Sequence, residues 1–235
     1  MSEALSVQFD LVVFDWDGTL IDSTGAITEA IRSSAADLGL PVPSRERASH
    51  VIGLGLLDAV HHAVPAIVRE QIPAFVERYR HHFLRADSHL LPFEGIDQLL
   101  AELDSRGAIL AIATGKSRAG LDRALTQTGW ERRFRATRCA DEGAPKPDPW
   151  MLRDLCGELG IELGRTLMIG DTTHDLRMAA SAGAAAVAVT YGAHPDHELG
   201  AHDPLAMVAS VAQLRGWLLP RLGLDPLDER GAGPG

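Results

Sequence analysis

The sequence predicts an α/β fold, in which a Rossmann-like core with a parallel β-sheet carries an all-helical insert after its first strand. After about residue 89, short apolar runs typical of buried strands alternate with amphipathic stretches typical of helices. Such alternation, with short connections, indicates a parallel sheet covered on both faces. Between about residues 20 and 88 the apolar spacing is helical and no convincing strand occurs. The predicted core is therefore residues 1–19 and 89–235, and the predicted insert is residues 20–88.

The first strand is expected at residues 11–14, an apolar run with β-branched members that ends abruptly in Asp15-Trp16-Asp17-Gly18-Thr19. In an extended chain Asp15 and Asp17 lie on the same side. Two carboxylates at the end of a buried strand are unfavourable unless they bind a hard cation or divide nucleophilic and acid–base roles between them. Taken alone, the motif leaves an ordinary strand with an Asp-rich turn as the alternative.

The remaining elements follow from apolar spacing and from capping residues. Ser117 suits the start of a helix and Gly129 its end, and Pro149 and Gly160 bracket another helix in the same way. Helices are expected at 25–38, 48–64, 68–84, 96–106, 117–128, 149–159, 173–181 and 205–219, and strands at 108–113, 135–139, 166–169 and 185–190.

Composition excludes several classes of function. The formal net charge of −10 argues against binding nucleic acid or a membrane surface. The two cysteines, Cys139 and Cys156, have no metal-ligand spacing and suit a reducing compartment. The N-terminal residues lack the pattern of a secretory signal, and no apolar run approaches the length of a membrane span. The expectation is a soluble, cytoplasmic protein.

Polar groups follow four of the predicted strands, at the edge where open α/β sheets bind ligands. Besides Asp15 and Asp17, these are the Thr114-Gly115-Lys116-Ser117 segment, Lys146 between two prolines, and the segment from Gly170-Asp171 to Asp175. A hydroxyl followed by backbone amides at a helix start suits a phosphate group. The ordered set resembles the haloacid dehalogenase superfamily, specifically its phosphatase branch, over nearly the whole chain.

The resemblance implies a role for each matching residue in phosphoryl transfer. Asp15 would attack phosphorus and form an aspartyl-phosphate, and Asp17 would protonate the leaving oxygen and later activate water. Thr114 and the amide of Gly115 would bind the phosphoryl oxygens. Lys146 would neutralise Asp15 and the transferring group.

The resemblance also implies a Mg²⁺ site. Asp15, Asp171 and the carbonyl of Asp17 would hold the metal, and Asp175 would orient Lys146 or a metal-bound water. Charge repulsion supports this independently, because four converging carboxylates need a cation and a lysine to be tolerable. The presence of both Asp17 and Asp171 favours cleavage of phosphate esters over dehalogenation.

In this family a helical insert at this position is a small cap that closes over the phosphate site, which suits a small phosphorylated metabolite. The turn at Gly53-Leu54-Gly55 is a candidate substrate contact. Basic residues of the insert are further candidates, although a solvent-facing position is the plainer interpretation for each of them. They are Arg47, Arg78, Arg80 and Arg85.

The pattern is most similar to phosphoglycolate phosphatase-type enzymes, with two departures. Trp16 stands where Leu or Phe is more usual, and Thr114-Gly115-Lys116 stands where Thr-Asn-Lys is frequent. The expected activity is hydrolysis of a phosphoglycolate-type monoester. Alternatives are a phosphosugar mutase resembling β-phosphoglucomutase, a pyrophosphatase or 5'-nucleotidase, and, least expected, a non-catalytic binding protein.

Two further patterns are expected to carry no function. Gly115-Lys116-Ser117 is similar to the end of a P-loop, but Leu110 stands where that motif requires its first glycine. The pairs His61-His62 and His81-His82 are adjacent along helices and so do not share a face. They are interpreted as helix surface or cap lining and not as metal ligands.

Overall fold

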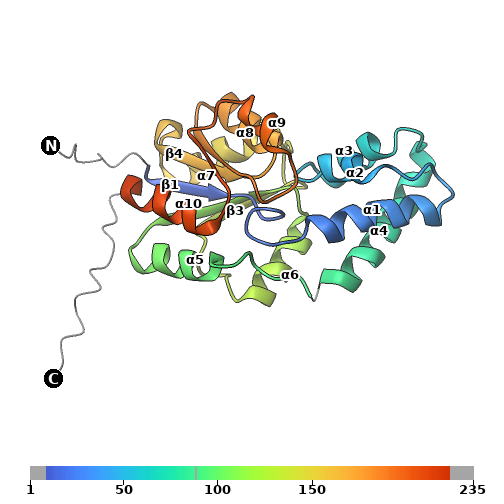
Figure 1. The fold of residues 1–235 in the computed structure, drawn as a ribbon, viewed down its shortest axis with the longest axis horizontal. Helices are drawn as coiled ribbons and strands as arrows, with labels where there is room; N and C mark the ends of the chain where they lie inside the picture. Colours follow the sequence, from blue (N-terminus) through green and yellow to red (C-terminus); the bar gives the residue numbers. More distant parts are fainter. Residues whose placement is uncertain (1–8, 88, 223–235) are drawn as a thin grey trace, which may run out of the picture.

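The centre of the core is a sheet of six parallel strands in the order β3-β2-β1-β4-β5-β6 (Figure 1). The computed structural model describes residues 9–87 and 89–222. The strands are β1 Leu11–Phe14, β2 Ile109–Thr114, β3 Ala136–Cys139, β4 Thr166–Gly170, β5 Ala185–Val189 and β6 Ala206–Val208. The predicted α/β class with a parallel sheet is confirmed.

Helices cover both faces of this sheet. They are α5 Ile96–Ser105, α6 Arg118–Thr128, α7 Trp150–Leu159, α8 Thr173–Ala182, α9 Asp196–Gly200 and α10 Val211–Leu218. Val12 and Phe14 pack with α5, α6 and α10, whereas Leu11 and Val13 pack with α7 and α8. Figure 1 shows α7 and α8 above the sheet and α5 and α10 below it. Alternate residues of β1 are thus buried on opposite faces.

The register of the central strands brings their carboxyl ends together. Phe14 at the end of β1 lies opposite Ile112 of β2 on one side and Ile169 of β4 on the other. The amide of Asp15 continues this pairing by donating to the carbonyl of Ile169 at 2.9 Å. Residues that follow β1, β2 and β4 therefore meet at one edge of the sheet, where ligands bind in folds of this class.

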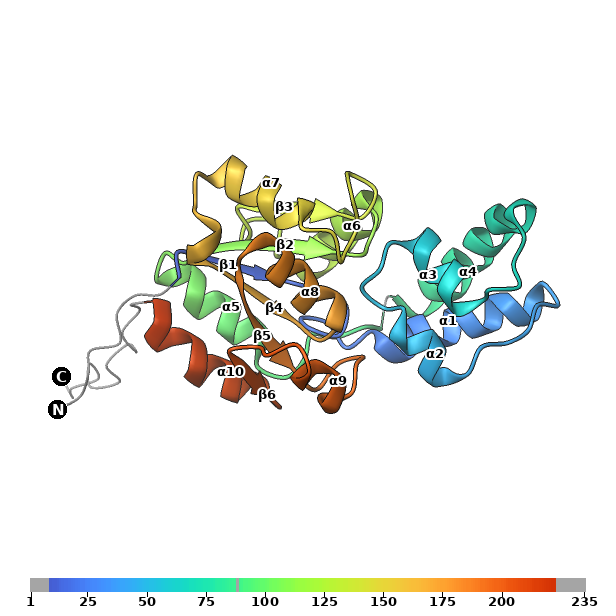
Figure 2. The same cartoon turned by 90° about the horizontal axis from the view of Figure 1, so that it is seen from above.

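The helices that follow β1 form a group with an apolar core of its own. They are α1 Thr24–Asp37, α2 Arg45–His50, α3 Leu56–Ala63 and α4 Ile72–Asp87, the last preceded by a 3₁₀ turn at Arg69–Gln71. Ile31, Val60 and Phe75 are buried in this second core. Figure 2 shows the group beside the sheet, beyond the carboxyl ends of the strands. None of the helices in the described part of the chain is long and apolar enough to cross a membrane.

Most predicted elements are confirmed to within a few residues, and two are wrong. The helix expected at 48–64 is interrupted, because the chain turns at Gly53, whose φ of +91° favours glycine, and α2 and α3 lie on either side. The helix expected at 205–219 begins only at Val211, where the Ser210 hydroxyl accepts from the amide of Gln213. The residues before it form the edge strand β6, which is too short to show a clear period.

The predicted boundaries of core and insert remain a prediction. Residues 1–8, 88 and 223–235, on which several of those boundaries fall, lie outside the described residues.

Candidate active site

Asp15 lies at the centre of the sheet edge and is completely buried. One carboxylate oxygen, Oδ1, accepts from the amide of Trp16 at 2.6 Å and lies 2.9 Å from Nζ of Lys146. The other oxygen, Oδ2, is buried without a hydrogen-bond partner among the described residues. Burial raises the pKa of Asp15 well above its ordinary value, and the charge of Lys146 partly opposes this effect. An unpartnered buried carboxylate oxygen is costly, so it indicates a position where a ligand belongs.

Lys146 supplies the positive charge of the site. Its side chain is fully buried, and Nζ lies 2.6 Å from Oδ1 of Asp175, so that it bridges two carboxylates. Burial lowers the pKa of Lys146, but the charges of Asp15 and Asp175 outweigh burial and leave the pKa above its ordinary value. Lys146 is therefore an ammonium ion near neutral pH.

Asp175 is fixed by the start of α8. Its Oδ2 accepts from the amide of Thr172 at 3.1 Å and from the Thr172 hydroxyl at 2.7 Å, which forms a reciprocal capping arrangement at the helix N-terminus. The opposite oxygen, Oδ1, accepts from Lys146. This geometry suits the predicted role of Asp175 in orienting the lysine.

Asp171 is held from two sides just after β4. Its Oδ1 accepts from the Thr19 hydroxyl at 2.8 Å, and its Oδ2 accepts from the amide of Ala193 at 2.7 Å. Burial, together with the charge of Asp175, raises the pKa of Asp171 to about 7. Gly18 has a φ of +80°, and a Cβ there would lie 2.1 Å from Oδ2 of Asp171. Glycine therefore allows the chain after Asp17 to approach this carboxylate closely.

Asp15, Asp171 and Asp175 each offer a carboxylate oxygen within 4.8 Å of the others. All three are completely buried. Hard divalent cations prefer such oxygen ligands, and the unpartnered Oδ2 of Asp15 provides a free one. The donor set therefore fits Mg²⁺ better than a metal that selects nitrogen or sulfur ligands.

The carboxylate of Asp17 is not part of that acidic group. Its Oδ1 accepts from the Ser23 hydroxyl at 2.7 Å, and its two oxygens lie 3.0 and 3.1 Å from Nζ of Lys116. Nζ of Lys116 also lies 4.8 Å from the centre of the Phe83 ring, which belongs to α4. Lys116 and Trp16 line an adjoining cavity of about 550 Å³. The side chain of Asp17 thus faces the helical group, and its backbone carbonyl is the atom predicted to bind metal.

Thr114 ends β2 and Gly115 follows it, at the same edge of the sheet as Asp15. The Thr114 side chain is fully buried, and its hydroxyl accepts from the amide of Lys116 at 3.2 Å. A Cβ on Gly115 would lie 2.6 Å from the carbonyl oxygens of both Gly53 and Leu54. The turn predicted as a contact of the insert therefore sits directly on the predicted phosphate-binding residue.

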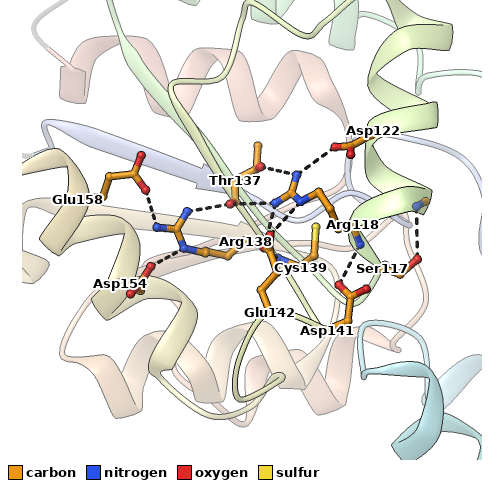
Figure 3. Close-up of polar contacts among 11 residues, drawn as sticks. Ser117, Arg118, Asp122, Thr137, Arg138, Cys139, Asp141, Glu142, Asp154 and Glu158 are labelled. Carbon is orange, nitrogen blue, oxygen red and sulfur yellow. Dashed lines mark hydrogen bonds and ion pairs between the residues drawn. The ribbon is translucent and has the colours of Figure 1, made fainter.

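A polar network holds Asp141 and Glu142, which follow β3 and begin the connection toward Lys146 (Figure 3). Arg118, at the start of α6, donates through Nε and Nη2 to the two carboxylate oxygens of Glu142, each at 2.9 Å. Glu142 in turn accepts from the amide of Cys139 at 2.8 Å, and Asp141 accepts from the amide of Arg118 at 2.9 Å. Burial raises the pKa of the Cys139 thiol to about 12, so the thiol stays protonated. The network thus ties the end of β3 to the start of α6.

Several contributors had little or no sequence signal. Thr19 ends the first motif and Ser23 lies shortly after it, but nothing in their spacing indicates which carboxylate each would bind. Lys116 was noted only as a member of the segment that follows the second strand and of a P-loop-like pattern, and neither indicates its pairing with Asp17. Ala193 acts through its backbone amide, which no side-chain pattern reveals.

The other candidates of the insert face solvent. The four basic residues named as candidate substrate contacts are all exposed, which agrees with a solvent-facing position for each. They are Arg47, Arg78, Arg80 and Arg85. His61 and His81 are exposed as well. His62 bonds within α3, to the carbonyl of Asp58, and His82 bonds to Asp37 of α1.

Comparison with known proteins finds a matching family and relatives that cover most of this chain. The family described as haloacid dehalogenase-like hydrolase matches residues 12–189. A protein of Dickeya dadantii named "Probable phosphatase IndB" is 36% identical over 88% of this chain and 92% of its own length. A 5'-nucleotidase of Pseudomonas aeruginosa is 31% identical over 89% of this chain and 96% of its own. A crystal structure described as a predicted phosphoglycolate phosphatase from Haemophilus somnus has a TM-score of 0.82 and 25% identity, and covers 90% of this chain and 99% of that one.

Proposed function

The chain belongs to the haloacid dehalogenase-like hydrolase family and is a hydrolase of phosphoric monoesters, and we propose that it cleaves a small phosphorylated metabolite through an aspartyl-phosphate, with Mg²⁺ as cofactor. The observation that carries the proposal is the state of Asp15. One oxygen of its buried carboxylate is paired with a buried lysine, and the other has no partner among the described residues. A carboxylate held in this way is a preorganised nucleophile.

The residues divide the reaction between them. The Asp15 carboxylate attacks phosphorus, a new O–P bond forms, and the bond from phosphorus to the leaving oxygen breaks. Asp17 gives that oxygen its proton, and afterwards accepts a proton from the water that cleaves the aspartyl-phosphate. Thr114 and the amide of Gly115 bind the phosphoryl oxygens, and Lys146 offsets their charge.

The metal would be held by Asp15, Asp171 and the backbone carbonyl of Asp17. Bound Mg²⁺ would supply charge neutralisation for the phosphoryl oxygens. Asp175 keeps Lys146 in place through a second ion pair to the same nitrogen atom, Nζ, that contacts Asp15.

Residues 20–88 would act as a cap over this site. Asp15, Thr114 and Asp171 are completely buried, so a substrate can reach them only when the cap moves away from the sheet edge. Closure excludes water, which strengthens the electrostatic interactions of the site and protects the aspartyl-phosphate until its own hydrolysis step.

Gly115→Ala tests this closed arrangement. The added Cβ would lie 2.6 Å from two backbone carbonyl oxygens of the cap, so the cap cannot seat fully. Overpacking of this kind costs about 1–3 kcal/mol, and we therefore expect kcat/KM to fall about 10- to 100-fold with little change in the unfolding temperature. Gly157→Ala is the matched control, since a Cβ there meets nothing within 4 Å. Unchanged kinetics in Gly115→Ala would show that the cap does not close on this residue during turnover.

The substrate that we propose is a small phosphoglycolate-type metabolite, and the relative named as a phosphoglycolate phosphatase supports it. The relative named as a 5'-nucleotidase supports a nucleoside monophosphate as the second candidate. A mutase resembling β-phosphoglucomutase would use the same nucleophile and return the phosphoryl group to a sugar phosphate. A purely binding role is supported least, because it gives no reason to keep three mutually repelling buried carboxylates.

The deciding experiment is phosphate release from a panel of esters with Mg²⁺ and with EDTA. The panel contains phosphoglycolate, pyrophosphate, hexose phosphates, nucleoside monophosphates and p-nitrophenyl phosphate. We expect EDTA to lower the rate at least about 100-fold, because the buried carboxylates then repel the phosphoryl group, and Mg²⁺ to restore it. Equal release in EDTA would contradict the cofactor assignment. A rate that depends on an added sugar bisphosphate would indicate the mutase.

A further inference from the structure

Three histidines meet where the cap touches the core, outside the groups used by the proposed reaction. His50 ends α2 of the cap, His174 lies in the first turn of α8, and His194 lies between β5 and α9. We call this group the histidine clasp. His174 and His194 are 7% and 2% exposed, although histidine is on average only partly buried in proteins.

Both core histidines bond to the same atom of the cap. Nε2 of His174 lies 3.1 Å, and Nε2 of His194 lies 3.0 Å, from the carbonyl oxygen of His50. A carbonyl can only accept, so both Nε2 atoms must carry a proton and donate. Nδ1 of His194 accepts from the amide of Thr173 at 3.1 Å, which fixes the same tautomer independently.

The arrangement is suited to hydrogen bonding and not to holding a metal. The rings of His50 and His194 stack face to face, with centroids 4.3 Å apart and planes inclined by 21°. One nitrogen of each ring lies within 4.8 Å of the others, but the Nε2 atoms of the core pair are protonated and Nδ1 of His194 accepts from the Thr173 amide. Of the core pair only Nδ1 of His174 lacks a partner among the described residues, and one available nitrogen does not make a metal site. The shared carbonyl is near the end of a helix, where it lacks a partner within α2.

Two more contacts join the same end of α2 to the core. The Ser49 hydroxyl donates to the carbonyl of Ala193 at 3.1 Å. Nε2 of His50 lies 3.0 Å from Oε2 of Glu198 in α9. Consecutive residues of the cap are thus held by residues of the core that lie on both sides of His194.

The core side of the clasp also holds Asp171. The amide of Ala193 donates to Oδ2 of Asp171 at 2.7 Å, and the amide of His194 donates to its backbone carbonyl at 3.3 Å. A Cβ on Gly192 would lie 2.2 Å from Oδ2 of the same carboxylate, so this segment lies directly against it. One segment therefore contacts the cap with one side and orients Asp171 with the other.

We infer that His174 and His194 are positioning residues that fasten the closed cap, through the His50 carbonyl, to the segment that orients Asp171. The inference rests on the proposed function for the role of Asp171 and of cap closure. The end of α2 is then a second point at which the closed cap contacts the core, separate from the Gly53–Leu54 turn that covers Gly115. Because the site is buried when the clasp is formed, the clasp must open and re-form in each turnover.

The test compares His174→Phe, His194→Phe and the double variant with the wild-type chain. Phenylalanine keeps a planar ring and removes the donor. The first readout is hydrogen–deuterium exchange of peptides that cover residues 45–63. A net contribution per hydrogen bond of the usual size gives about 2- to 10-fold faster exchange in each single variant and more in the double variant.

The second readout is the kinetics of p-nitrophenyl phosphate hydrolysis. We expect kcat of the double variant to fall about 10-fold while KM changes much less, because the open form still binds substrate but only the closed form reacts. Glutamine at either position keeps an amide donor of similar reach, so His174→Gln and His194→Gln should recover most of the lost protection. If the histidines contributed only through packing, the glutamine variants would not recover the lost protection from exchange.

His82→Phe is the matched control, since His82 bonds to Asp37 inside the cap and not to the core. Wild-type exchange and kinetics in the double variant, or the same changes in His82→Phe, would overturn the inference. If the phenylalanine variants fail to fold, Ser49→Ala takes their place, because it removes the hydrogen bond from the end of α2 to the carbonyl of Ala193, next to His194. Wild-type exchange in that variant would show that the bonds between the end of α2 and this segment do not hold the cap closed, and would overturn the inference. The exchange readout needs no activity, so a wild-type chain without phosphatase activity would refute the proposed function while the clasp is still tested.

Discussion

Replacing Asp15 with Asn lowers kcat for phosphate release by at least about 10,000-fold, the range expected when a covalent nucleophile is removed. The amide has nearly the shape of the carboxylate but cannot form the aspartyl-phosphate. Lys146 still has Asp175 as a partner, so the rest of the site is expected to keep its arrangement. The measurement is steady-state phosphate release with saturating Mg²⁺.

The same variant should be more stable than the wild-type chain when EDTA is present. Burial and the nearby Asp171 and Asp175 raise the pKa of Asp15, which means that the folded state disfavours its charged form. A neutral amide removes that repulsion, and a gain of about 1 kcal/mol raises the unfolding temperature of a chain of this size by about 2–4 °C. Loss of activity together with a gain of stability is typical of a functional site and not of a damaged fold.

Asp10→Asn provides the matched control at the other end of β1. Asp10 is exposed and paired with Arg165, so the same substitution should leave kcat unchanged. Retained activity in Asp15→Asn would show that another group attacks phosphorus. A lower unfolding temperature in EDTA would show that Asp15 contributes more through its pair with Lys146 than it loses through repulsion.

The sequence predicts those site residues that directly follow a recognisable strand. The strand that ends in Asp15 was recognisable because apolar residues stop abruptly at a charged motif. The edge of the sheet then followed from topology, since parallel strands place their carboxyl ends together. Thr114, Lys146 and Asp171 were predicted to meet Asp15 for this reason, and the structure brings Lys146 and Asp171 close to it.

Contacts between segments far apart in the sequence were not predictable in the same way. The ion pair of Asp17 with Lys116 depends on the conformation of the turn after β2, which the spacing of apolar residues does not predict. The clasp depends on a backbone carbonyl at His50, an atom that every residue carries. The interruption at Gly53 was missed because apolar spacing continues across it, although its glycine was the available signal.

Lys146→Met is expected to damage both stability and activity. The side chain of Lys146 is 0% exposed and bridges Asp15 and Asp175, so the substitution leaves two buried carboxylates without their cation. Removal of one partner from a buried ion pair destabilises a protein by about 3–5 kcal/mol. Activity should fall about 100- to 1,000-fold, since a preorganised charge beside the phosphoryl group is lost. Urea unfolding in EDTA and steady-state kinetics in Mg²⁺ measure the two effects.

A second substitution separates the structural effect of Lys146 from its chemical one. Asp175→Asn in the Lys146→Met background removes one of the two uncompensated carboxylates, so the double variant should regain about half of the lost stability. It should not regain activity, because Asp15 and the phosphoryl group still lack the ammonium ion. Recovery of activity along with stability would mean that Lys146 only balances charge within the fold. Failure to recover stability would mean that Asp175 is held mainly by Thr172 at the start of α8, and that the ion pair adds little to it.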